Sequence, residues 1–244
     1  MDGLRDFGDQ AGERRKPRKS VWNGTKSRTA CFICTNRRAG LKEVGGVITG
    51  KTVVRTQGDS TDLGQRLHWE ALRGGLGRAQ QTLVLGDGIP WIWNLKDNRW
   101  PQARELLDFW HGSQHLWSLG RAYNRMDEAK AQPWVRRRME RLYQGQEQKV
   151  LKEISTLKVS RSQCGQIVRK EKNYFAGQSK RMSYKEIADK GWPIGSGPVE
   201  SSCRQDQRRF KGPGQSWTHQ GFANLSALDQ ARRNNHWDQL WFSA

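Results

Sequence analysis

Residues 191–203 read Gly-Trp-Pro-Ile-Gly-Ser-Gly-Pro-Val-Glu-Ser-Ser-Cys, a glycine-rich turn that leads into an expected helix. Pro198 suits the first helical position, and Gly197 or Ser196 can cap the helix. Glu200 then falls in the first turn, where the helix dipole favours a carboxylate. The stretch therefore predicts one acid presented at the start of a helix, which can act either as a helix-start residue or as a metal ligand.

A second stretch carries an acid in a different setting. Residues 82–91 read Thr-Leu-Val-Leu-Gly-Asp-Gly-Ile-Pro-Trp, so Asp87 follows a short apolar strand expected over residues 82–85. The flanking glycines let the backbone turn sharply and let a bulky ligand approach, although Asp-Gly is also common in ordinary turns. A carboxylate at a strand end and a carboxylate at a helix start can meet at one metal site, even when they are far apart in sequence.

The charge balance of the chain points to a polyanionic partner. The 244 residues carry a formal net charge of +19, with dense basic runs at 14–19, 136–138 and 208–209. Such a balance favours phosphate backbones or anionic membrane surfaces. The sequence has no apolar run long enough to span a membrane and no hydrophobic signal core at its start. We therefore expect a nucleic acid as the partner, no membrane partner and a cytoplasmic location.

Tryptophan and cysteine usage add two further expectations. The 12 Trp are expected mostly in the core, since each buries a large area, although the same ring also stacks on nucleobases. The few cysteines favour a reducing compartment. Cys31 and Cys34 have the spacing of half a zinc site, but they lie in a strand expected over residues 29–35, where residues three apart point to opposite faces. We therefore do not expect them to share an ion.

The expected elements form a mixed α/β core with helical additions. Strands are expected over residues 29–35, 52–56, 82–85 and 105–110. An amphipathic helix is expected over residues 61–77, capped by Asp59 or Ser60. Residues 114–190 follow a helical pattern. The last block is expected to hold a helix, a Gly-Pro-Gly break at 212–214 and a second helix that carries Leu225 and Leu228.

This order divides the chain into four parts. They are a basic arm with the remnant of a first strand (1–28), an α/β core (29–113), a helical insertion (114–190) and a C-terminal helical part of the core that carries Glu200 (191–244).

Other polar residues near these stretches are candidates for supporting roles. Asp108 and His111 stand near the end of the fourth expected strand, where both can reach a phosphate site if the strand gives way to a turn, or can form a buried polar pair. Arg204 and Arg208 are four residues apart on the expected helix and share a face. With Arg209 and Lys211 they can grip phosphates or form a solvated basic face.

Four stretches resemble a known family. They are Leu85-Gly-Asp-Gly-Ile-Pro-Trp-Ile-Trp-Asn94, Leu107-Asp-Phe-Trp-His111, the stretch 191–203 and the tail 233–241. Together they resemble bacterial insertion-sequence transposases of the DDE type, in particular the Kra-type group. The likeness covers nearly the whole chain; it is specific at the first three stretches and loose over residues 4–60 and the helical insertion. It implies an RNase H-like mixed sheet flanked by helices, with an all-helical insertion before the last catalytic acid.

The resemblance also implies a set of site residues. The second and third catalytic acids of the family fall on Asp87 and Glu200, and the first falls on Asp2, in the pair Asp2-Gly3. Asp108 and His111 match an Asp-x-x-His element of the related Mutator-like transposases. Since the first strand of this fold needs several residues before its acid and only Met1 precedes Asp2, the expectation is an N-terminally truncated chain.

The reaction implied by the resemblance is two-metal phosphoryl transfer on DNA. The three acids would hold two Mg²⁺ ions, with Mn²⁺ as a substitute, to activate a water and later a DNA 3′-hydroxyl for in-line attack. The first step nicks an element end and the second joins that end to target DNA. Proteins of this type commonly act as homo-oligomers, and a bacterial, nucleoid-associated location follows.

Three alternatives stay open from the sequence. The chain can be an inactive transposase remnant that only binds DNA, or an RNase H-like nuclease that does not transpose. It can also be a basic DNA- or RNA-binding protein whose acids serve only as caps and turn residues.

Overall fold

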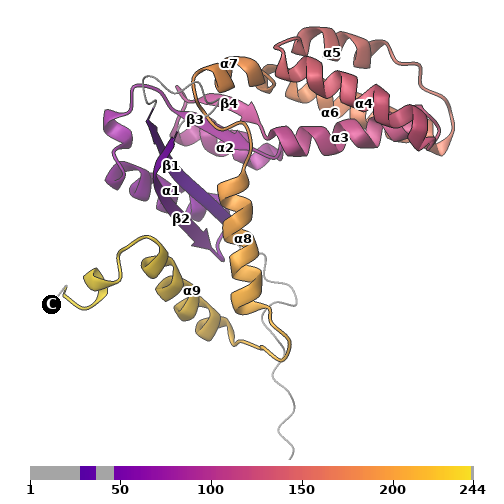
Figure 1. Ribbon diagram of the computed structural model, residues 1–244. Helices are drawn as coiled ribbons and strands as arrows, with labels where there is room; N and C mark the ends of the chain where they lie inside the picture. The colour runs from indigo at the N-terminus through magenta and orange to yellow at the C-terminus, as the bar shows by residue number, and fades with distance from the viewer. Residues whose placement is uncertain (1–27, 37–46, 243–244) are drawn as a thin grey trace, which may run out of the picture.

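The computed structural model describes residues 28–36 and 47–242. These residues form a mixed α/β protein in which helices predominate (Figure 1). Asp2 and the arm expected over residues 1–28 lie outside this range, apart from Arg28. One group of helices extends to one side of the strands, and a long helix near the C-terminus runs down from it past the strands (Figure 1).

The first two strands form an antiparallel pair. β1 (Arg28–Asn36) and β2 (Val47–Thr56) pair in a register that runs from Arg28↔Thr56 to Asn36↔Val47. Helix α1 (Ser60–Arg73) packs on both strands. Asp59 is its N-cap, as expected, and its carboxylate accepts hydrogen bonds from the backbone N–H groups of Thr61 and Asp62, both at 2.9 Å.

Helix α1 is shorter than the sequence predicted. It ends at Arg73 instead of residue 77, because Gly74 caps it and Gly75 takes a left-handed conformation with φ of 98°. A short 3₁₀ turn (Leu76–Arg78) follows. The glycine pair therefore stops the helix where the apolar pattern alone did not predict a stop.

The other two strands form a short parallel pair. β3 (Leu83–Gly86) and β4 (Arg104–Leu107) pair in a register that ends at Gly86↔Leu107. Helix α2 (Pro90–Arg99) makes the crossover between them that a parallel pair requires. We expected one mixed sheet, but the described strands form two separate two-stranded sheets. The sequence analysis also missed α2, since its apolar residues Trp91, Ile92 and Trp93 are consecutive and give no helical stripe.

The strand expected over residues 105–110 is wrong at its end. β4 stops at Leu107, and Asp108 is the N-cap of helix α3 (Phe109–Tyr123). The carboxylate of Asp108 accepts a hydrogen bond from the backbone N–H of His111 at 2.9 Å. The helical block therefore begins at residue 109 and not at residue 114. This correction places Asp108 and His111 at a strand-to-helix turn.

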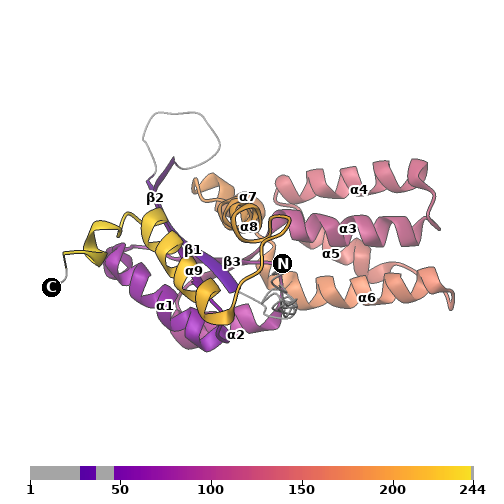
Figure 2. The same ribbon diagram turned by 90° about the horizontal axis from the view of Figure 1, so that it is seen from below.

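The helical block shares one apolar core with the parallel strand pair. Its other helices are α4 (Glu128–Tyr143), α5 (Glu147–Thr156), α6 (Gln163–Gln178) and α7 (Tyr184–Asp189), with a 3₁₀ turn at Ser179–Arg181. Seen from below, α3 lies between α4 and α6 (Figure 2). Leu107, Leu116 and Phe175 are among the side chains buried where the block meets β4. No helix among the described residues has both the length and the apolar character needed to span a membrane.

Two C-terminal helices complete the fold. α8 (Gly197–Phe210) contacts β1, and α9 (His219–Arg233) contacts β2. The break expected at 212–214 separates them, and α9 carries Leu225 and Leu228 as expected. A short 3₁₀ turn (Asp238–Leu240) follows α9. The two thiols of β1 contact different elements, since Cys31 bonds the carbonyl of Pro198 and Cys34 bonds that of Gly74, in accord with opposite faces of the strand.

A buried group of charges joins β2, α8 and α9. Arg55 of β2 pairs with Asp206 of α8 at 2.6 Å and with Asp229 of α9 at 3.0 Å, and Arg233 pairs with both acids. Burial opposes ionisation of Asp229, but the hydrogen bond from Arg55 and the nearby positive charges hold its pKa below the usual value. Burial raises the pKa of Asp206 despite Arg55 and Arg233. We call Arg55, Asp206, Asp229 and Arg233 the buried ion group.

The outer edge of β2 is occupied by amide side chains of α9 and its cap. Asn234 accepts a hydrogen bond from the backbone N–H of Val53 and donates one to its carbonyl, both at 2.8 Å. Gln230 accepts from the backbone N–H of Arg55 at 2.8 Å. These bonds satisfy strand groups that would otherwise face solvent or another chain.

Candidate metal centre

Two acids stand side by side at one edge of the parallel strand pair. Because Gly86 pairs with Leu107, the residues that follow, Asp87 and Asp108, leave neighbouring strands at the same carboxyl end. Parallel strands place the residues beyond their carboxyl ends together, which is where ligands bind in many α/β proteins. The fold therefore brings together Asp87 and Asp108, which the sequence analysis had assigned to separate motifs.

Asp108 is the buried centre of this region. Its side chain is 0% exposed, and its two oxygens accept hydrogen bonds from the backbone N–H groups of His111 and Ser196. Burial opposes ionisation, but the hydrogen bonds from Ser196 and His111 outweigh it and hold the pKa of Asp108 below its usual value. Asp108 is therefore a carboxylate at neutral pH.

The same contacts bring Glu200 to this edge. Asp108 binds the backbone of Ser196, and the backbone N–H of Phe109 donates to the carbonyl of Ile194 at 3.0 Å. Helix α8 begins at the next residue, Gly197, so Glu200 lies in its first turn as predicted, and Ser196 Oγ lies 3.2 Å from Glu200 Oε1. The glycine-rich loop is thus fastened to the start of α3, which fixes the position of Glu200.

Asp108, His111 and Glu200 form a group that could hold a metal ion. Each offers one ligand atom, and these atoms lie within 4.8 Å of one another. His111 Nδ1 is buried, has no hydrogen-bond partner and lies 3.5 Å from Asp108 Oδ1. Two carboxylates and one imidazole suit Mg²⁺, Mn²⁺ or another divalent cation. The donor set and the unpartnered ring nitrogen therefore fit a divalent ion. We call these three residues the metal group.

The metal group differs from the ligand set implied by the family resemblance. Glu200 is common to both, whereas Asp108 and His111 were expected only in support. Asp87 is half-buried and lies outside the group; its carboxylate accepts from the backbone N–H of Ile89 at 3.1 Å. Asp2 lies outside the described residues. The Asp-x-x-His spacing was the sequence signal for the two new members.

The turn that carries Asp87 is held by helix α6. Tyr174 Oη donates to the carbonyl of Asp87 at 3.4 Å, and Gln178 Nε2 donates to that of Gly88 at 3.0 Å. Burial raises the pKa of Tyr174, and the negative charges of Asp87, Glu171 and Asp108 raise it further, so the phenol stays protonated as a donor. The sequence analysis missed these α6 residues. Glu171, Tyr174 and Gln178 form a polar stripe on one face of an otherwise packed helix, which is a signal that could have found them.

The tyrosine is itself fixed by a polar network. Its ring stacks on His115 of α3, with centroids 3.6 Å apart. His115 Nδ1 lies 2.7 Å from Glu171 Oε2, and Ser118 Oγ donates to Glu171 Oε1 at 2.9 Å. Glu171 is buried, so both of its oxygens gain from these partners. The network links α3 to α6, the helix that holds the turn after β3.

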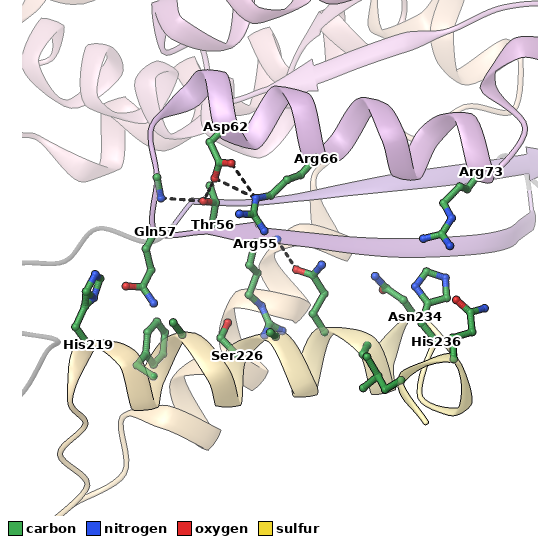
Figure 3. A pocket seen from close by; sticks show the side chains of 18 residues that line it. Arg55, Thr56, Gln57, Asp62, Arg66, Arg73, His219, Ser226, Asn234 and His236 are labelled. Atoms are coloured by element: carbon green, nitrogen blue, oxygen red, sulfur yellow. Dashed lines mark hydrogen bonds and ion pairs between the residues drawn. The ribbon is translucent and has the colours of Figure 1, made fainter. Parts of the chain in front are cut away.

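Basic side chains outside the metal group lie on two surfaces. The predicted DNA-contacting residues Arg204, Arg208, Arg209 and Lys211 are all exposed at or just after α8, although Arg209 also pairs with Asp229 at 3.2 Å. A cavity of about 680 Å³ lies between α1, the end of β2 and α9 (Figure 3). Its lining includes Arg66, Arg73, His219 and His236, but also Asp62, which pairs with Arg66 at 2.9 Å. Arg55 lines it too, although its charge is paired within the buried ion group. The exposed basic residues of α8 therefore suit an anionic ligand better than this cavity does.

The contacts of Asp108 predict a pH-dependent effect of Asp108→Asn. At about pH 7 an amide cannot accept from both backbone N–H groups with the strength of a carboxylate, so we expect a loss of about 1–3 kcal/mol in the free energy of unfolding. The folded protein lowers this pKa, so the stabilisation is complete above the ordinary value of 3.8 and is lost as the pH falls below it.

Urea unfolding of both proteins, from about pH 7 down to about pH 2, measures this difference. Asp59→Asn is the matched control, since Asp59 is an exposed helix N-cap and asparagine caps equally well. A difference between Asp108→Asn and the parent protein that stays constant with pH would contradict the assignment.

Comparison of the chain with protein-family models, with curated proteins and with solved structures finds no match.

Proposed function

We propose that this chain is the catalytic region of a DDE-type insertion-sequence transposase, with an RNase H-like core that transfers phosphoryl groups on DNA. The observation that carries the proposal is the meeting of Asp108, His111 and Glu200 at the carboxyl end of a parallel strand pair, with Asp87 on the neighbouring strand end. The net charge of +19 supports a polyanionic substrate. The resemblance of the three motifs specifies the reaction.

Each side chain has a role in this proposal. Asp108, His111 and Glu200 each offer one ligand atom for the ion, and Asp87, which follows the end of the neighbouring strand, would complete the set. Asp108 stays ionised and holds the loop before α8 against α3. Two Mg²⁺ ions, or Mn²⁺ in their place, would supply an activated water or 3′-hydroxyl and stabilise the leaving oxygen. Asp2 is included among the metal ligands, as the first acid, only because of the family resemblance.

Basic residues would position the DNA around this edge. Arg204 and Arg208 are exposed one helical turn apart, beyond Glu200 on the same helix, and can neutralise phosphates near the reacting one. Arg73, which lines the cavity beside α9, would offer a second contact for the backbone. In this proposal the protein acts as a homo-oligomer at the bacterial nucleoid, where it binds element ends and target DNA.

The direct test is a metal-dependent nicking and joining assay. The chain with Mg²⁺ is expected to nick DNA that carries the inverted repeats flanking its gene and to join the released 3′ end to a target plasmid. EDTA should abolish both products, and fresh Mg²⁺ should restore them, which separates metal loss from protein loss. Nicking without joining would favour the RNase H-like nuclease, and DNA binding without nicking would favour an inactive remnant.

A further inference from the structure

Trp110 is a large apolar side chain left open to solvent beside the metal group. It lies between Asp108 and His111 in sequence, in the first turn of α3, and 55% of its surface is exposed. Its neighbour Phe109 is 1% exposed and belongs to the core. Burying an aromatic side chain stabilises a protein, and an indole that stays exposed does not contribute this stabilisation to the free protein.

The indole is held in place by its surroundings. Its ring meets that of Phe109 edge to face, with centroids 5.5 Å apart, and Phe109 is fixed by Tyr143 and Tyr184. The edge of the indole lies against the loop before α8: a Cβ on Gly195 would stand 3.0 Å from Trp110 Cδ1 and Nε1. Trp110 is therefore a fixed platform that needs little ordering when a ligand binds.

The position of this platform indicates its ligand. The same point on Gly195 is 3.9 Å from Asp108 Oδ2, so the indole and the buried carboxylate of the metal group border one spot on the loop. A ligand at this place would combine a group that binds a divalent ion with a flat ring that stacks on indole. A nucleotide has both parts, as a phosphate and a base, and the charge of the chain favours it.

We propose that Trp110 stacks on an unpaired nucleobase next to the phosphate held at the metal group, so that this site takes a single-stranded or flipped-out nucleotide. The phosphate part of this inference rests on the proposed function. The stacking part adds a substrate property, because a base inside an intact duplex does not offer its face to a side chain.

The test compares the binding of two labelled strands by fluorescence anisotropy in Mg²⁺. One is a thymidine oligonucleotide of about a dozen nucleotides, and the other is an abasic strand with the same backbone. Trp110→Leu keeps apolar bulk against Phe109 but removes the ring, whereas Trp110→Phe keeps a ring. Trp69→Leu is the matched control, since Trp69 is 61% exposed on α1.

The parent protein should bind the base-bearing strand more tightly than the abasic strand. Trp110→Leu should reduce this preference by about 5- to 150-fold, which corresponds to one stacked base, while Trp110→Phe keeps most of it and Trp69→Leu leaves it unchanged. Circular dichroism checks that all variants keep the helical content of the parent protein.

The inference would be overturned if Trp110→Leu and the parent protein preferred the base-bearing strand equally, or if the parent protein showed no preference between the two strands. The result is independent of catalysis. A chain that shows the stacking effect but never nicks DNA would remove the transposase proposal and leave the stacking site. A chain that nicks DNA without the stacking effect would support the transposase proposal and remove the stacking site.

Discussion

Glu200→Gln is expected to reduce metal-dependent nicking by more than about 100-fold while the fold and DNA affinity stay close to those of the parent protein. The substitution removes one charged ligand atom of the metal group and keeps the size of the side chain. Loss of residues that only support metal ligands typically costs 10- to 100-fold, so loss of a ligand should cost more. Glu200 is exposed at the start of α8, and its replacement therefore leaves the core unchanged.

Nicking rates over a series of Mg²⁺ and Mn²⁺ concentrations measure this effect, with binding to the same DNA measured in parallel. Glu140→Gln is the matched control, because it makes the same change at an exposed position of α4. The two variants raise the net charge equally, so a general electrostatic effect on DNA binding cancels between them. Equal nicking by the two variants would remove Glu200 from the site.

Asp229→Asn is expected to lower the free energy of unfolding by about 3–5 kcal/mol. Asp229 is 2% exposed and pairs with Arg55 and Arg233 inside the buried ion group. In the variant, residue 229 carries no negative charge, so Asp206 is the only acid of the group left to pair with these two arginines. Burial raises the pKa of Asp206, which opposes its ionisation. The buried positive charges would then lack sufficient compensation.

Urea unfolding at about pH 7 measures the loss. Asp189→Asn is the control, since Asp189 pairs with Lys185 at the surface with 62% of its side chain exposed, and such pairs contribute about 0–1 kcal/mol. Similar midpoints for the two variants would mean that the buried ion group adds little to stability. A weaker attachment of α8 should also be visible as lower nicking activity, because α8 carries Glu200.

Local signals in the sequence predicted the elements that local chemistry determines. The glycine-rich turn and Pro198 placed Glu200 in the first turn of a helix, and the break at 212–214 was correct. The cap of α1 was expected at Asp59 or Ser60, and Asp59 is the cap. Each of these depends on residues within a few positions of one another. The α/β class also followed, although the described strands pair as two small sheets and not as one.

Contacts between distant segments account for what the sequence could not predict. Asp108 read as a strand residue because Leu106, Leu107, Phe109 and Trp110 are apolar, yet its partners are the backbone of His111 and that of Ser196, 88 residues away. The sequence analysis assigned no role to Asp206 and Asp229, because their partner Arg55 comes from the distant strand β2. The family resemblance supplied Asp87 and Glu200 but did not indicate that Asp108 would lie beside Glu200.

The amide groups of Gln230 and Asn234 act on β2 as an adjoining strand would. A strand with open hydrogen-bonding groups can recruit copies of itself and begin fibril growth. Here α9 must detach before the sheet can extend beyond β2, so the terminal helix protects the chain against edge-to-edge aggregation.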